Sequence, residues 1–339
     1  MTTAGPARDD VAVDVRRRPQ RAALVGQAMV FVLLVIAAAA NAALQPTFFT
    51  AYNLSSMFAT FAPSVAAAVA QTIVVLTGAI DLSLGALITL ASVVAVVLVD
   101  GDPSKIPLAV AAALAVGLLG GLFNGLLVAL VRLQPIVATF ATTFVFGGLA
   151  LTVLPQPGGS VPVEVTTAYR AATLGVPNAL WLILLVALLW VALRRSRLGI
   201  HLYAVGGNTT AAFATGVRVT RVQVAAYLVA GLFAGVAALA ILANTGSGDP
   251  YVGSVGGAAI IGGELTLSSI AALVIGGTAL SGGRGGALGS IAGAIVLGLV
   301  ANIVFFLGVS SGMRELIDGL IVIGALAFTG APWLRRGRQ

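Results

Sequence analysis

Several residue types that carry chemistry in enzymes are missing or nearly missing from this chain of 339 residues. It has no cysteine, which excludes disulfides, thiolate catalysis and cysteine-ligated metal. It has a single histidine, His201, so a zinc site built on several histidines is not supported. The single lysine, Lys105, precedes an isoleucine, so no Gly-Lys-Ser/Thr phosphate-binding loop exists. The sequence therefore predicts no catalytic residues, no metal site and no ATP site of this kind, and hence no enzyme in its own right.

Charged residues are also scarce. Asp, Glu, Lys and Arg make up 9% of the chain, hydrophobic residues make up 59%, and the mean hydropathy is +1.08. Soluble domains are about one-quarter charged, and many apolar runs here reach the roughly 20 residues that a spanning helix needs. The sequence predicts an all-α polytopic membrane protein. The net charge of +7 lies mostly in tails and loops, which indicates contact with anionic membrane lipid and no nucleic-acid partner.

The apolar runs predict about ten transmembrane helices with both termini in the cytoplasm. The expected spans are about 22–44, two within 57–99, 106–131, 135–154, 178–193, 222–243, 258–281, 287–307 and 315–328. This arrangement places fifteen of the eighteen Lys and Arg on one side, and short loops rich in these residues stay in the cytoplasm. The expected domains are a cytoplasmic tail at 1–21, a transmembrane domain at 22–330 and a second cytoplasmic tail at 331–339.

A basic stretch at 194–221, between the sixth and seventh expected spans, is predicted to be a cytoplasmic loop. It contains five arginines and the histidine. Asn208-Thr209-Thr210 offers N-cap oxygens for a short helix over 211–214, which Gly216 can end. Such a helix, entered and left through glycines, is a candidate docking surface for a partner. The alternative is a basic loop that only fixes the topology.

An acidic residue interrupts the apolar run 57–99, within the segment TGAIDLSLG at 77–85. A carboxylate at membrane depth is costly, so we expect Asp81 to face a cavity, a polar partner or the membrane interface. The glycines of this segment would permit a broken helix, which is tolerated only against protein or water. Two roles stay open for Asp81: with Ser83 it can cap the following helix, or it can act directly on a solute pathway.

Further polar side chains lie in the expected spans. A neutral amide there can meet a polar solute or hydrogen bond one helix to another, and the second role is favoured for any single residue. Glu264, in the eighth expected span, is expected at the membrane interface. The candidate translocation pathway comprises Gln71, Asp81, Ser83, Asn124 and Asn302.

Three sequence blocks occur in a fixed order along the chain. They are AIDLSLG at 79–85, with Asn53 twenty-eight residues before Asp81; RLG at 197–199 with YAVGGN at 203–208 and TGV at 215–217; and IAALVIGGTALSGGRG at 270–285. Together they resemble the ribose-type permease family of ATP-binding-cassette (ABC) importers over nearly the whole chain from about residue 48. Thr209 stands where the family often has an acidic residue, so the detailed contact with an ATPase is left open.

The resemblance implies a ten-helix subunit in the bacterial cytoplasmic membrane that pairs with a second permease copy or a paralogue. Two cytoplasmic ATP-binding subunits would use ATP and Mg, an extracytoplasmic sugar-binding protein would deliver the sugar, and this chain would bind no cofactor. The implied ATPase-coupling residues are Gly206, Gly207, Asn208, Thr209, Thr210, Ala211, Ala212 and Gly216.

The predicted function is therefore import of a monosaccharide, such as a pentose or hexose, powered by separate ATPase subunits. One alternative is an ion-coupled secondary transporter with Asp81 as its proton or cation site, which the three matched blocks disfavour. Another keeps the ABC permease and changes the cargo to a nucleoside, a polyol or a signalling-sugar derivative. The sequence leaves the cargo open, because few pathway side chains decide specificity.

Overall fold

The computed structural model describes residues 29–252 and 263–308, together with 313, 316, 317, 319, 320 and 323. The predicted tails at 1–21 and 331–339 lie outside the described residues, as do the beginnings of the first and eighth expected spans and most of the last. The described chain is almost entirely helical, which confirms the all-α prediction.

Six helices of the described residues are long and apolar enough to cross a membrane. They include α2 (Ala51–Val75), α4 (Ile106–Ala129, preceded by the 3-10 turn η1, Pro103–Lys105), α5 (Pro135–Val153), α7 (Asn178–Arg195), α10 (Val219–Thr245) and α12 (Ala287–Phe306). Three apolar helices are shorter: Met29–Leu44, α3 (Leu84–Val99) and α11 (Gly263–Ile275). These nine helices fall on nine of the ten expected spans, while the tenth span and the sidedness of the termini stay predictions.

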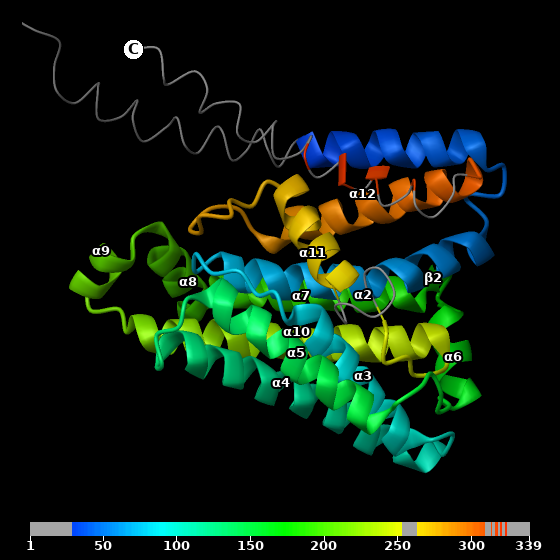
Figure 1. The fold of residues 1–339 in the computed structure, drawn as a ribbon. Helices are drawn as coiled ribbons and strands as arrows, with labels where there is room; N and C mark the ends of the chain where they lie inside the picture. The colour runs from blue at the N-terminus through cyan, green and yellow to red at the C-terminus, as the bar shows by residue number, and fades with distance from the viewer. Residues whose placement is uncertain are drawn as a thin grey trace, which may run out of the picture.

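The short elements gather at the two ends of the helix bundle (Figure 1). At one end lie α8 (Arg197–Gly207) and α9 (Thr209–Ala214), and at the other lie α6 (Val163–Arg170) and the antiparallel pair β1 (Ala172–Thr173) and β2 (Val176–Pro177). The segment 155–177, which lies between two of the expected spans, thus contains a helix and a small hairpin. Hydropathy did not reveal this helix and hairpin, because it detects only segments that are apolar enough to span a membrane.

Helix α2 forms the centre of the bundle, packed against α10, α11, α12 and α7. In its most apolar 18-residue window 83% of the residues are buried, whereas the corresponding figure for α7 is 22%. A helix that is apolar on all sides is suited to such burial, and an alanine-rich stretch at 66–70 lets its neighbours approach closely. The polar groups near the end of α2 and in the segment after it, such as Gln71, Thr72 and Asp81, are therefore buried within protein.

A run of glycines in α4 faces α10. A Cβ added at Gly117 would overlap the carbonyl oxygen of Gly231, and one at Gly121 would overlap that of Tyr227. The two backbones are therefore in direct contact. Small residues at such positions let helices associate where lipid supplies no hydrophobic driving force.

The predicted helix break is present: α2 ends at Val75 and α3 begins at Leu84. The expected eighth span needs correction, because α11 ends at Ile275 and not at residue 281. Gly277 and Gly282 have φ of 77° and 82°. A right-handed helix cannot continue through these values. A second irregular segment, 276–286, therefore joins α11 to α12.

Candidate functional site

Three of the five candidate pathway residues form one buried hydrogen-bonded cluster at the α2–α3 break. The Oδ1 atom of Asp81 accepts hydrogen bonds from the Ser83 backbone N–H at 2.8 Å and from Ser83 Oγ at 2.7 Å. Ser83 Oγ in turn accepts from Asn124 Nδ2 on α4 at 2.7 Å. Asp81 is only 3% exposed, and the other two residues are fully buried. The carboxylate thus holds the backbone at the start of α3, which is the shaping contact expected of it.

Threonines from two other helices satisfy the backbone of the break. Thr139 Oγ1 on α5 accepts from the Leu82 N–H at 3.0 Å, and Thr143 Oγ1 donates to the Leu82 carbonyl at 3.1 Å. Thr266 Oγ1 on α11 accepts from the Gly85 N–H at 2.9 Å. Backbone groups freed by a break at membrane depth need such partners. Sequence reasoning missed these threonines, although the spacing of Thr139 and Thr143 places both on one face of α5.

The remaining two candidate residues do not hydrogen bond to this cluster. Asn302 Nδ2 on α12 donates to Asn41 Oδ1 at 2.9 Å, and Asn41 Nδ2 donates to the Leu299 carbonyl at 3.0 Å. This pairing joins α12 to the helix Met29–Leu44. Gln71 on α2 is fully buried, and neither atom of its amide has a hydrogen-bond partner among the described residues. Such a group is costly, which keeps Gln71 among the candidates for contact with a polar solute.

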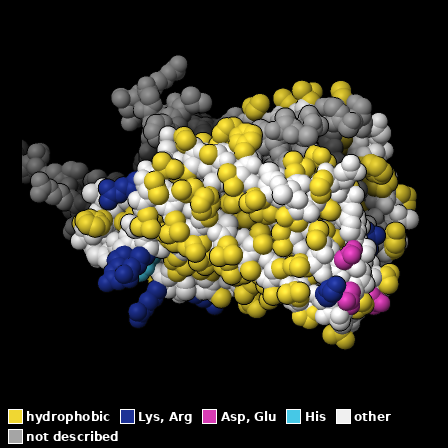
Figure 2. All heavy atoms as spheres, turned by 60° about the horizontal axis from the view of Figure 1, so that its bottom comes forward, with side chains coloured by type: hydrophobic (Ala, Val, Ile, Leu, Met, Phe, Trp, Pro, Cys, Tyr) yellow, Lys and Arg dark blue, Asp and Glu magenta, His cyan; other side chains and the backbone are white. Residues whose placement is uncertain are grey.

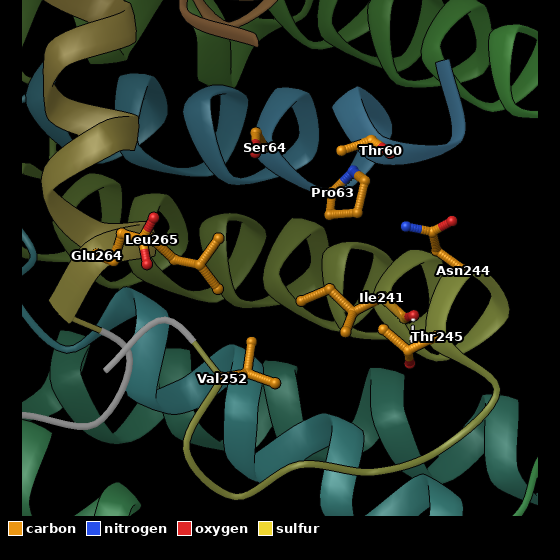
Figure 3. Close-up of a pocket in the computed structure, with 9 residues that line it drawn as sticks. All are labelled: Thr60, Pro63, Ser64, Ile241, Asn244, Thr245, Val252, Glu264 and Leu265. Carbon is orange, nitrogen blue, oxygen red and sulfur yellow. Dashed lines mark hydrogen bonds between the residues drawn. The ribbon is translucent and has the colours of Figure 1, made fainter. Parts of the chain in front are cut away.

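A hollow of about 200 Å³ opens between α2, α10 and the start of α11 (Figure 3). Sequence reasoning considered only one of the residues that line it, Glu264, and placed that residue at the membrane interface. The signal that could have found the polar ones is the pair of hydroxyl side chains one turn apart within α2 and the polar end of α10. The lining residues are Thr60, Pro63, Ser64, Ile241, Asn244, Thr245, Val252, Glu264 and Leu265.

Helix α6 bridges the two long helices beside this hollow. Pro63 has no N–H, so the Ala59 carbonyl of α2 lacks its helical donor. The Tyr169 hydroxyl replaces that donor at 3.0 Å, and burial raises the pKa of Tyr169 above its usual value, which keeps the hydroxyl protonated. Arg170 Nη2 donates to the Asn244 carbonyl of α10 at 2.6 Å and lies 3.3 Å from Asn244 Oδ1.

The short helix predicted over 211–214 is present as α9, which begins at Thr209, at the opposite end of the bundle. Asn208 Oδ1 caps it by accepting from the Ala211 N–H at 2.9 Å, and Gly216 follows it with φ of 86°. Its Phe213 is 72% exposed. The expected glycine-rich entry is wrong in one respect: Gly206 and Gly207 complete a preceding helix, α8, whose N-cap is Ser196. Arginines flank both helices, and Figure 2 shows Lys and Arg gathered at this end and acidic side chains at the other.

The end of α8 packs directly on both irregular segments. A Cβ added at Gly206 would overlap the Leu76 carbonyl oxygen at the end of α2. That same oxygen accepts from the Gly283 N–H at 3.1 Å, and the Tyr203 hydroxyl of α8 donates to the Gly285 carbonyl at 2.8 Å. A displacement of α8 would therefore act on the α2–α3 break and on segment 276–286 together. In contrast to Gly206, a Cβ added at Gly207 would meet nothing within 4 Å.

Comparison with known proteins relates this arrangement to transport. Residues 53–326 match the family described as branched-chain amino acid transport system / permease component. The ribose import permease protein of Bacillus subtilis (strain 168) is 36% identical over 305 residues, which cover 87% of this chain and 89% of that protein. The ribose import permease protein of Escherichia coli (strain K12) is 34% identical, with coverage of 93% and 96%. The fructose import permease protein of Rhizobium meliloti is 31% identical, with coverage of 85% and 80%. No solved structure matches at a significant level.

Proposed function

Because this chain belongs to the branched-chain amino acid transport system / permease component family, we propose that it is the membrane subunit of an ABC importer that moves a monosaccharide across the bacterial cytoplasmic membrane. Its relatives are named as permeases for ribose, fructose and D-allose, which supports a pentose or hexose as the cargo. The absence of a phosphate-binding loop from the sequence agrees with ATP and Mg being used by separate subunits.

The observation that carries the proposal is the contact of α8, which leads directly into α9, with the end of α2 and with segment 276–286. An ATPase subunit would dock on the exposed surface of α9, which includes Phe213. Its movement would reach α2 and segment 276–286 through the Gly206–Leu76 contact, because closely packed backbones cannot yield independently. ATP hydrolysis in the partner would thereby shift the subunit between outward-facing and inward-facing forms. The coupling residues in this proposal are Gly206, Gly207, Asn208, Thr209, Thr210, Ala211, Ala212 and Gly216.

The proposed topology has ten spans, with both termini and α8–α9 in the cytoplasm. The five exposed arginines at 194, 195, 197, 218 and 221 support this sidedness, because short basic loops are retained on the cytoplasmic side. Helix α6 and the β1–β2 hairpin then face outward, where a sugar-binding protein would approach. A second permease copy or a paralogue would complete the assembly, as the family resemblance implies.

The proposed pathway passes the α2–α3 break, where a buried carboxylate, a serine and an asparagine meet. Helix breaks at membrane depth line protein or water, and intramembrane acids usually mark solute paths. Asp81, Ser83 and Asn124 would shape the break and Gln71 would offer an unpartnered amide to the solute. Asn302 is retained as a pathway candidate on its sequence position alone.

Co-purification and uptake test the proposal together. The tagged chain is isolated from its native membrane, and the expected companions are an ATP-binding subunit and a second permease subunit. The assembly is then placed in vesicles with the cognate binding protein, and ATP-dependent uptake of labelled ribose, fructose and allose is measured. A chain that moves solute on a proton gradient with no ATPase partner would contradict the proposal.

A further inference from the structure

We propose that the hollow between α2, α10 and α11 is a sugar-binding site on the extracytoplasmic side, in which Glu264 and Asn244 hydrogen bond to sugar hydroxyls. This inference rests on the proposed function and names a site for its cargo. The first support is space. A water molecule needs about 10–15 Å³ of such a hollow, so about 200 Å³ has room for a small polyhydroxy compound and not only for isolated water.

The second support is the set of unused hydrogen-bonding groups in the hollow. Glu264 is an exposed carboxylate, and among the described residues the structure records neither an ion pair nor a hydrogen bond to its side chain. Ser64 likewise has no recorded side-chain hydrogen bond within the described chain. The Thr60 hydroxyl donates to the Ser56 carbonyl at 3.0 Å, which leaves its oxygen free to accept.

The orientation of Asn244 supplies a donor opposite the carboxylate. Arg170 lies against the Asn244 carbonyl and side-chain oxygens, which orients the amide. Figure 3 shows the amide nitrogen on the side of the hollow and the amide oxygen turned away from it. Asn244 and Glu264 come from different helices, so a solute between them would contact a donor from α10 and an acceptor from α11. Separate hydroxyls of one sugar could serve the two groups, because every hydroxyl both donates and accepts.

The rest of the lining suits a neutral sugar better than an ion. Pro63, Ile241, Val252 and Leu265 are apolar and would pack against ring carbons. Glu264 is the single acidic residue of the lining, whereas Ca²⁺ takes about 6–8 oxygen ligands and usually several carboxylates. An anion would be repelled by the same carboxylate. The hydroxyls of a neutral sugar can donate strong hydrogen bonds to the Glu264 carboxylate, and no counter-charge is needed.

The position of the hollow connects it to the proposed pathway. Leu265 lines the hollow, and the next residue, Thr266, accepts a hydrogen bond from Gly85 and lies 3.3 Å from the Leu82 carbonyl. Val252 also lines the hollow, and its carbonyl accepts from Thr89 of α3 at 3.3 Å. A sugar that contacts Glu264 would therefore lie against α11 two residues before Thr266, which contacts the α2–α3 break directly.

The first test uses the natural absence of cysteine from this chain. Ser64→Cys, in the assembled importer in membrane vesicles, is labelled from outside with a membrane-impermeant maleimide. Whichever of ribose, fructose or allose the wild type imports fastest should slow this labelling at least about fivefold. Thr167→Cys on the exposed face of α6, away from the hollow, should label at the same rate with and without sugar. Equal labelling of Ser64→Cys with and without sugar, or protection by sodium and not by sugar, would overturn the proposal.

The second test removes the charge. Glu264→Gln should raise the KM for uptake about tenfold, the loss expected when a charged hydrogen-bond acceptor is replaced by a neutral one, with little change in the maximal rate. Glu164→Gln, an exposed acid on α6 outside the hollow, is the matched control and should leave the KM unchanged. Wild-type protein that imports no sugar would overturn the proposed function itself. Wild-type uptake with an unchanged KM in Glu264→Gln would overturn only the binding site.

Discussion

Gly206→Ala provides the sharpest test of how the cytoplasmic end is linked to the membrane interior. The added Cβ would overlap the Leu76 carbonyl oxygen and would lie 2.7 Å from the Gly283 backbone nitrogen. Both are backbone atoms, so no side chain can rotate away to make room. The end of α8 must therefore move away from α2 and from segment 276–286. We expect ATP hydrolysis to become uncoupled from sugar transport.

The size of the effect follows from the packing. Inserting a methyl group into a close-packed contact costs about 1–3 kcal/mol. If this cost falls on only one of the two transport conformations, the equilibrium between them shifts by about 5- to 150-fold. Intrinsic helix propensity acts in the opposite direction, because alanine is better than glycine in a helix by about 1 kcal/mol. A loss of transport could not therefore be assigned to a weakened α8.

The assay measures sugar uptake and sugar-stimulated ATP hydrolysis in the same reconstituted vesicles, with co-purification of the ATPase as the measure of assembly. Gly206→Ala should assemble normally and lose at least about tenfold in uptake per ATP hydrolysed. Gly148→Ala in α5, outside the proposed coupling region, is the control and should remain within about twofold of wild type, because its Cβ would enter open space. Equal behaviour of the two variants would refute the argument. So would a Gly206→Ala variant that fails only because the ATPase no longer binds.

Three further substitutions test other contacts. Asp81→Asn should retain folded, assembled protein while removing the charge, and a loss of uptake in this variant would favour a pathway role for Asp81. Normal uptake in Asp81→Asn, together with a loss of folded protein in Asp81→Ala, would favour a purely structural role. Asn208→Ala removes the α9 N-cap, worth about 1 kcal/mol, and should reduce ATPase co-purification while binding-protein docking persists; unchanged uptake would contradict docking at α9. Tyr169→Phe should lower the free energy of unfolding in detergent by about 1–2 kcal/mol. This loss should nearly vanish in a Pro63→Ala background, because the alanine restores a helical N–H donor to the Ala59 carbonyl. An equal loss in both backgrounds would show that the hydrogen bond from Tyr169 to Ala59 is unimportant.

Local features of this protein could be predicted where the cause lies within a few residues. The helix break at Asp81 was recognisable because one acid with flanking glycines interrupts an apolar run. Helix α9 was recognisable because a cap residue and a terminating glycine lie six to eight residues apart in a basic loop. Helix α8 was missed because its glycines, Gly206 and Gly207, resemble loop residues, and only the tertiary contact with Leu76 explains why one of them must be small.

The sequence by itself determined the membrane class, the helical fold, the position of the break at Asp81 and the short helix of the basic loop. Each follows from hydropathy, charge or capping within a short window, and these act before distant parts of the chain meet. Only the tertiary structure decided which groups satisfy the break, that Tyr169 replaces the donor lost at Pro63, and that Glu264 and Asn244 line one hollow. These contacts join residues that are far apart in the chain. They depend on how helices of similar apolar composition pack, which periodicity and composition do not specify.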